Sequence, residues 1–134
     1  MTSPQEVIEN VRPDLILADA LQPVSSKTPR MRARWILNTD PQGWDGTAIS
    51  EWELIGAGLA DHYPHDEISL VLAGGLHIEV NGVEVVGRAG DTISVPAGTT
   101  GRDWAPKYAR MFGVYGPNPE GAESQYLEYW EIND

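Results

Sequence analysis

The sequence predicts an all-β fold, a small antiparallel β-barrel or double-sheet jelly roll over residues 31–134, with a short N-terminal helix before it. The 14 glycines and 10 prolines are 24 of 134 residues, or about 18%. Average usage is roughly 12%, so the excess indicates many turns. From residue 31 onward, short apolar runs alternate with these turn residues, as in consecutive strands. The length allows one core, and closing the sheet removes exposed edges.

Residues 1–30 are expected to form a helix and an extended arm. Ser3-Pro4-Gln5-Glu6 has the pattern of a helix start, with a capping residue, a proline and then a glutamate. Arg12-Pro13 ends this helix. Residues 14–21 fit either a strand or a helix, and the prolines and hydroxyl residues of 23–29 predict an irregular connector.

Eight strands are expected in the domain that follows. Asn81-Gly82 lies between two apolar runs and predicts a hairpin, since a type I′ turn needs positive φ at both positions. Gly74-Gly75 predicts a break between two strands. The expected strands are residues 32–37, 49–59, 68–73, 76–80, 83–86, 92–95, 108–115 and 125–132.

Composition excludes several kinds of site and partner. The chain has no cysteine, which excludes disulfides, thiolate metal sites and a cysteine nucleophile. Its formal charge of −11 does not favour nucleic acid or anionic membranes, and it slightly favours neutral or cationic metabolites. No apolar run is long enough to span a bilayer, and the first residues lack the pattern of a secretory signal. We therefore expect a soluble, cytoplasmic protein with no nucleic-acid or membrane partner.

The residues with chemical potential gather in Asp61–Gly74. His62, His65 and Glu67 lie within six residues of one another. Imidazole and carboxylate groups are ligands of Zn, Mn, Fe and Ni, and they also form acid–base pairs near neutral pH. Strand alternation places Glu67 on one face with Ser69, Val71 and Ala73. If that face lines a barrel, the small neighbours leave space for a ligand.

This segment resembles the first motif of the cupin superfamily. His62 matches the second histidine of that motif, Glu67 follows after four residues, and Gly74 follows after six more. Gly90-Asp91, Pro96 and Gly98 match the second motif, so the resemblance covers about residues 48–115. It implies a β-barrel with an interior pocket.

Two positions depart from the cupin motifs. Ala60 stands at the first histidine and Gly101 at the histidine of the second motif, so two of the four metal ligands remain, His62 and Glu67. The pattern Pro-x-Gly-x-x-Gly-x-x-Trp over residues 96–104 resembles the ethanolamine-utilisation-type cupins. That resemblance implies a small, largely antiparallel barrel, often dimeric, whose activities are diverse and whose metal site is often incomplete.

Two functions are compatible with these residues. The first is an enzyme with lyase- or isomerase-type acid–base chemistry on a small metabolite, with His62 and Glu67 as catalytic residues. One divalent ion (Mn, Fe, Ni or Zn) can assist it, held by His62, Glu67 and His65. The alternative is a sensor or carrier that binds a small ligand without turnover. The enzyme needs His62 within hydrogen-bond reach of Glu67 or of a bound substrate.

Further residues are candidate ligand contacts. Trp52 has the same strand parity as His62, so both face the interior unless a bulge at Gly56 or Gly58 intervenes. Asp103 shares a face with Gly101 and can take the space of the missing histidine. The remaining candidates are a hydroxyl donor, a stacking ring and an arginine that would bind an anion if it pointed inward, namely Tyr63, Trp104 and Arg34.

A homodimer is also expected. The segment 125–132 is acidic and aromatic and alternates like a strand. Together with residues 14–21 it is the candidate contact between two copies.

Overall fold

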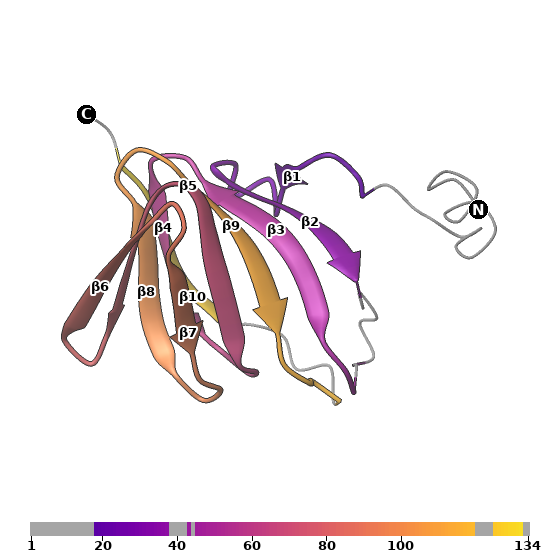
Figure 1. The fold of residues 1–134 in the computed structure, drawn as a ribbon. Helices are drawn as coiled ribbons and strands as arrows, with labels where there is room; N and C mark the ends of the chain where they lie inside the picture. The colour runs from indigo at the N-terminus through magenta and orange to yellow at the C-terminus, as the bar shows by residue number, and fades with distance from the viewer. Residues whose placement is uncertain (1–17, 38–42, 44, 120–124, 133–134) are drawn as a thin grey trace, which may run out of the picture.

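The computed structural model describes residues 18–37, 43, 45–119 and 125–132, and in them it confirms an all-β fold (Figure 1). Every strand pair found there is antiparallel. The helix predicted from Ser3 lies outside the described residues. The strands are β1 (Gln22–Pro23), β2 (Met31–Leu37), β3 (Ala48–Leu54), β4 (Ala57–His62), β5 (Glu67–Val80), β6 (Val83–Arg88), β7 (Thr92–Val95), β8 (Thr100–Ala105), β9 (Ala109–Tyr115) and β10 (Gln125–Glu131).

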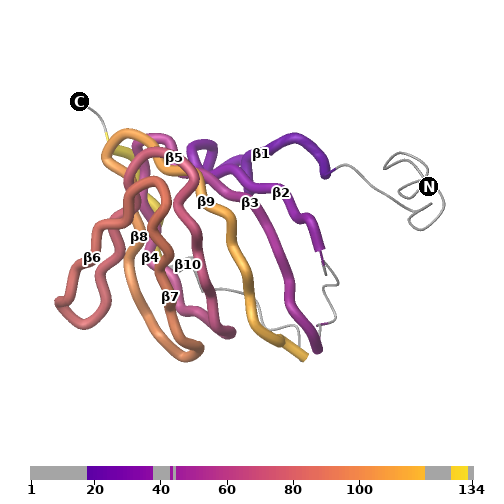
Figure 2. The backbone as a smooth tube through the Cα atoms, viewed as in Figure 1, coloured from indigo at the N-terminus to yellow at the C-terminus, as the bar shows by residue number. Residues whose placement is uncertain are grey.

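Strand β5 belongs to both halves of one curled sheet. The strand order is β1-β2-β3-β9-β5-β8-β4-β10, and β6 and β7 also pair with β5. Residues 67–74 pair with β7 and β9, whereas residues 75–80 pair with β6 and β8. Figure 2 shows β5 between the β3–β9 side and the β8–β4 side of the molecule. The two halves therefore curve around a common interior.

The bend in β5 occurs at Gly74. Its φ is +76°, and a Cβ atom there would lie 2.0 Å from the carbonyl oxygen of Tyr108, so only glycine fits. A register shift between Val71 and Ala73 precedes the bend. The predicted break at Gly74-Gly75 is thus wrong, because one 14-residue strand passes through this position.

The predicted strand 49–59 is two strands, β3 and β4. Gly56, with φ at +58°, interrupts it after Leu54. Trp52 and Leu54 face the interior, and the inward series resumes at Ala57 rather than at residue 56. The interruption shifts the alternation by one residue, which decides the orientation of the side chains that follow.

The Asn81-Gly82 hairpin is confirmed, with φ of 52° and 81° at the two positions. Strand β8, by contrast, was not expected, because its sequence Thr-Gly-Arg-Asp-Trp-Ala lacks apolar alternation. The two residues of β1 lie in the predicted irregular arm and pair with β2 at the sheet edge.

The interior holds one apolar core. Over the described ranges, no helix is long and apolar enough to cross a membrane. The core side chains come from both halves of the sheet and are Met31, Trp52, Leu54, Leu59, Tyr63, Val71, Leu76, Ile78, Val95, Ala105, Ala109 and Met111.

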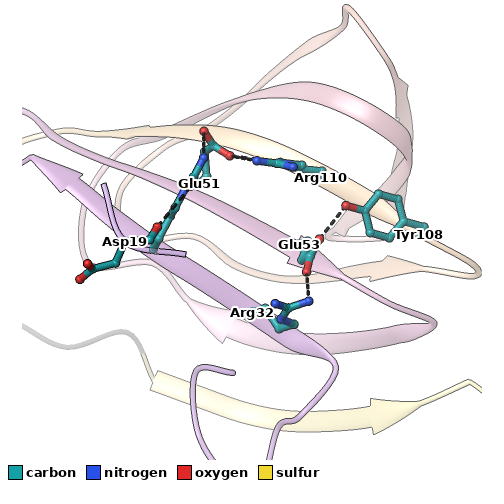
Figure 3. A network of polar contacts seen from close by, with 7 residues as sticks. Asp19, Arg32, Glu51, Glu53, Tyr108 and Arg110 are labelled. Carbon is teal, nitrogen blue, oxygen red and sulfur yellow. Dashed lines mark hydrogen bonds and ion pairs between the residues drawn. The ribbon is translucent and has the colours of Figure 1, made fainter. Parts of the chain in front are cut away.

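Arg34 lies on the outer face of β2 and not in the interior. Its guanidinium donates to Glu51 at 2.9 Å and to the backbone oxygen of Asp19 at 3.2 Å. Arg110 of β9 bonds the other carboxylate oxygen of Glu51, and Figure 3 shows this network on β2, β3 and β9. Burial alone would raise the pKa of Glu51, but the hydrogen bonds and charges of Arg110 and Arg34 outweigh it and lower the pKa. Arg34 therefore stabilises the pairing of β2 with β3 and is not a contact for a ligand in the interior.

Replacing Glu51 by glutamine is expected to lower the free energy of unfolding by about 2 kcal/mol, because two half-buried arginines lose their shared carboxylate. Urea unfolding at pH 7 measures this change. The control is Glu84→Gln, which removes an exposed carboxylate beside His77 and should cost less than about 1 kcal/mol. Equal losses in the two variants would contradict the role given to Glu51.

Candidate functional site

Four polar side chains meet in the interior between β4, β5 and β8. They are Asp61, Tyr63, Glu67 and Asp103, and all four are buried. The Tyr63 hydroxyl donates a hydrogen bond of 2.7 Å to Asp103 Oδ2. The charges of Asp61 and Asp103 act on both Glu67 and Tyr63. We call this group the acid cluster.

Backbone pairing places each member of the acid cluster. Asp61 follows Leu59 by two residues on β4, and Asp103 stands opposite Leu59 on β8. Glu67 opens β5 and pairs with Tyr115 and Val95. Tyr63 lies just past β4, where its N–H donates to Thr99 O at 2.9 Å and its carbonyl accepts from Gly98 N–H at 2.8 Å. Strand pairing and the two backbone hydrogen bonds of Tyr63 thus fix the positions of the four side chains of the acid cluster.

Burial and neighbouring negative charges raise the pKa values of Tyr63, Glu67 and Asp103 in the acid cluster. Burial raises the pKa of Glu67 well above its ordinary value, and the charges of Asp103 and Asp61 add to this; a hydrogen bond from Ser69 opposes it. Burial also raises the pKa of Asp103 to about 7, against the hydrogen bond from Tyr63, with a contribution from Asp61. Burial, followed by the charges of Asp103 and Glu67, raises the pKa of Tyr63, so its phenol remains a donor. Near neutral pH, Asp103 is therefore close to half ionised, and the pKa of Glu67 is shifted in the same direction.

Among the described residues, the buried polar atoms without a hydrogen-bond partner include Asp103 Oδ1 and Trp52 Nε1, which both lie in the interior. The indole nitrogen of Trp52 lies beside Gly113, where a Cβ atom would be 3.4 Å from it and 2.5 Å from the Tyr115 hydroxyl. Buried polar groups rarely remain unpaired, so each such atom needs an explanation. A ligand donor would satisfy Asp103 Oδ1, and a ligand acceptor would satisfy Trp52 Nε1.

His62 does not join Glu67. The interruption at Gly56 turns Asp61 inward and leaves His62 on the outer face of β4, where its Nδ1 lies 2.8 Å from Thr100 Oγ1. The predicted convergence of His62 and Glu67 inside the barrel is therefore wrong. Asp61 takes the inward place, and sequence reasoning missed it because the alternation was counted through an unbroken strand.

His65 is buried beside Tyr115. Its Nδ1 lies 3.2 Å from the Asp66 carbonyl oxygen, and its ring meets the Tyr115 ring edge-on at 5.2 Å. Burial lowers the pKa of His65, although hydrogen bonds with Asp66 and its own backbone oppose this. The ring is therefore neutral at neutral pH.

Trp104 faces outward from β8 and stacks on His77 at 5.2 Å, so it contacts no interior ligand.

The family model described as ethanolamine utilisation protein EutQ matches residues 49–119, more than half of the chain and the part that carries the acid cluster. The chain belongs to the EutQ family. A search of the curated proteins gives no significant match.

Solved structures related to this EutQ-family chain have the cupin fold. The EutQ protein of Clostridium difficile is 24% identical, with a TM-score of 0.59 over 72% of this chain and 76% of that one. An RmlC-like cupin from Shewanella frigidimarina is 19% identical, with a TM-score of 0.60 over 73% and 83% of the two chains. KdgF from Halomonas sp. is 17% identical, with a TM-score of 0.61 over 74% and 88%. At these identities the likeness shows the fold.

The metal that the cupin fold implies does not fit the residues of this EutQ-family chain. A Cβ atom at Gly101 would lie 2.9 Å from Val80 Cγ2 and 3.0 Å from the Glu79 carbonyl oxygen, so a histidine has no room there. His62 and Glu67 lie on opposite faces of the sheet. Over the part of the chain that the structure describes, no three His, Asp or Glu side chains are grouped to hold a metal ion. The set His62, Glu67 and His65 is therefore not a ligand set.

Proposed function

We propose that this EutQ-family protein is an enzyme that moves a proton within a small neutral or cationic substrate, a lyase- or isomerase-type reaction, with Asp103 as base and Glu67 as acid. One observation carries the proposal: two buried carboxyl groups with raised pKa values share the interior, and one of them has a pKa of about 7. Efficient general acid–base catalysts have pKa values near the working pH.

The hydrogen bonds give the two carboxyl groups different roles. The Tyr63 hydroxyl donates to Asp103 Oδ2 at 2.7 Å, while Oδ1 has no hydrogen-bond partner among the described residues, so Oδ1 is the atom that takes a proton from a substrate carbon beside a carbonyl. Glu67, whose pKa is raised by burial and by the charges of Asp103 and Asp61, donates its proton to the carbonyl oxygen or to a leaving group. Trp52 Nε1 adds a donor that orients the substrate. The charge of Asp61 adds to the effect of burial in raising the pKa values of the other two carboxyls.

The charge of the acid cluster supports the substrate class. Asp61, Glu67 and Asp103 are all buried, and bringing an anion beside them would add a like charge in a region of low dielectric. A neutral hydroxycarbonyl compound or a small amine avoids that repulsion. The description of the family, ethanolamine utilisation, agrees with an amine.

A second candidate is a protein that binds a small ligand without turnover. It is favoured by the outward position of His62, because the acid cluster then contains no imidazole. In this case Asp103 Oδ1 and Trp52 Nε1 only hydrogen-bond the ligand.

Deuterium incorporation from D₂O into dihydroxyacetone and aminoacetone, followed by NMR, tests the enzyme. We expect the wild type to exchange the proton beside the carbonyl of at least one probe, faster as pH rises through about 7. Asp103→Asn and Glu67→Gln should each slow this exchange by about 10²–10⁴-fold, the usual contribution of an acid or base. The control is His62→Gln on the outer face, which should retain the wild-type rate. No exchange with either probe, or exchange that survives Asp103→Asn, would refute the catalytic assignment, and saturable binding without exchange would favour the second candidate.

A further inference from the structure

The outer face of β2, β3, β9 and β5 carries an apolar patch, which we call the outer patch. Every second residue of β5 from Ile68 to Leu72 points outward, and these aliphatic side chains are 36–44% exposed. Strand pairing sets the outward residues of β9, β3 and β2 beside them. Contiguous exposed apolar residues mark an interaction site. The outer patch consists of Leu37, Ile49, Ile68, Leu70, Leu72, Phe112 and Val114.

The charged side chains that border the outer patch nearly cancel one another. Arg34 and Arg110 both pair with Glu51, and Arg32 pairs with Glu53 at 2.9 Å (Figure 3). These three guanidinium groups and two carboxylates sum to +1, in a chain whose net charge is −11. The border on the other side, at β7, presents a threonine and a serine. The described part of this face therefore lacks the net negative charge of the chain as a whole.

An apolar face of a sheet is covered either by a second sheet or by helices. Two sheets pack face to face at an angle that their twists determine. A second copy of this chain supplies a sheet with the same twist and the same apolar residues. We propose that the outer patch binds the outer patch of a second copy across a two-fold axis. In this dimer the aliphatic side chains of the two β5 strands meet, and the arginine–glutamate pairs lie at the rim.

Charge favours a second copy as the occupant of the outer patch. Two chains of net charge −11 repel each other, and this repulsion is weakest where the touching surfaces are not negative. The outer patch and its border meet that condition. A strongly charged partner gains little there, because the guanidinium groups at the border already pair with Glu51 and Glu53. The segment 125–132, expected from the sequence as part of the dimer contact, contains β10, which lies at the opposite end of the strand order from β1 and β2.

Light scattering of the full-length protein over a dilution series tests the proposal. We expect the wild type to be a dimer. Ile68→Asp should weaken the dimer at least about hundredfold, because the two-fold axis places two unpaired carboxylates in one apolar contact. The matched control is Val83→Asp, which changes a valine of β6 that is 67% exposed and lies outside the outer patch, and it should remain a dimer. Urea unfolding verifies that both variants fold.

Thiol labelling gives a second measurement that needs no charged substitution. The chain contains no cysteine, so a maleimide reacts only with an introduced thiol. Ile68→Cys places that thiol in the outer patch, and Val83→Cys places it on β6. The thiol of Ile68→Cys should react slowly in concentrated solution and faster on dilution, as the dimer dissociates. The thiol of Val83→Cys should react at the same rate at every concentration.

A monomeric wild type would overturn the proposal, as would a dimer that persists in Ile68→Asp or dissociates in Val83→Asp, since the contact then lies elsewhere. A thiol of Ile68→Cys that is protected at every dilution in a monomer would show that this chain's own residues outside the described ranges cover the outer patch, which also overturns it. The result is independent of the proton-transfer function, because Glu67→Gln changes a buried side chain of the interior and should leave the dimer unchanged.

Discussion

Raising the pH from 5 to 8 is expected to lower the free energy of unfolding by about 3 kcal/mol through Asp103 alone. The folded protein binds this proton with a pKa of about 7, whereas the unfolded chain binds it near 3.9. The folded state therefore binds more protons over this range. The contribution of Asp103 to the free energy of unfolding is largest at acid pH and is lost as the pH rises through 7. Glu67, whose pKa is also raised by burial, acts in the same direction.

The measurement is urea unfolding at pH 5, 6, 7 and 8 for the wild type and for Asp103→Asn. Groups that do not interact with Asp103 contribute equally to both proteins, so the difference between the two curves reports Asp103 together with its effect on Glu67. The asparagine variant retains an oxygen that accepts the Tyr63 hydrogen bond, and its stability should depend less on pH. Parallel curves would show that Asp103 ionises normally and would remove the basis for its role as a base near neutral pH.

Replacing Gly74 by alanine is expected to cost more than about 4 kcal/mol of stability, a large share of what a small domain has. The added methyl would stand 2.0 Å from the Tyr108 carbonyl oxygen, which also accepts a hydrogen bond from the Gly75 N–H at 3.0 Å. Relief requires β5 and β9 to separate at the bend. The positive φ adds a further penalty for any L-residue.

Gly90→Ala is the matched control for this variant. Gly90 also has a positive φ, at +95°, but a Cβ atom there would meet nothing within 4 Å. Its cost should be about 1–2 kcal/mol, the conformational penalty alone. Chemical denaturation of the two variants separates the steric part from the conformational part. Similar losses at both positions would mean that the bend at Gly74 relaxes easily.

Much of the fold follows from local patterns in the sequence. Asn81-Gly82 forms the predicted hairpin and β7 has the predicted bounds, because turn chemistry acts over a few residues. The bend at Gly74 was predicted as a break, since a glycine pair permits both a turn and a continuing strand and only the position of Tyr108 decides between them. Strand β8 was missed because its inward residues include Gly101 and Asp103, which do not read as a buried face.

The candidate site was predicted in part. Glu67, Tyr63, Trp52 and Asp103 were singled out from the sequence and lie in the interior. Asp61 faces the interior where His62 was expected. The reason is that Gly56, with its positive φ, shifts the alternation by one residue between β3 and β4 and so reverses the faces of the side chains along β4. A glycine within an alternating run warns of such a shift but does not reveal its sense.

The alternation along β8 has one more consequence. Arg102 lies on the outer face of the sheet and Asp103 in the acid cluster, so a single peptide unit separates an exposed residue from a buried acid. The sheet is a wall one strand thick at this place. A substitution on the outer face of β8 therefore lies next in sequence to the acid that accepts the Tyr63 hydrogen bond.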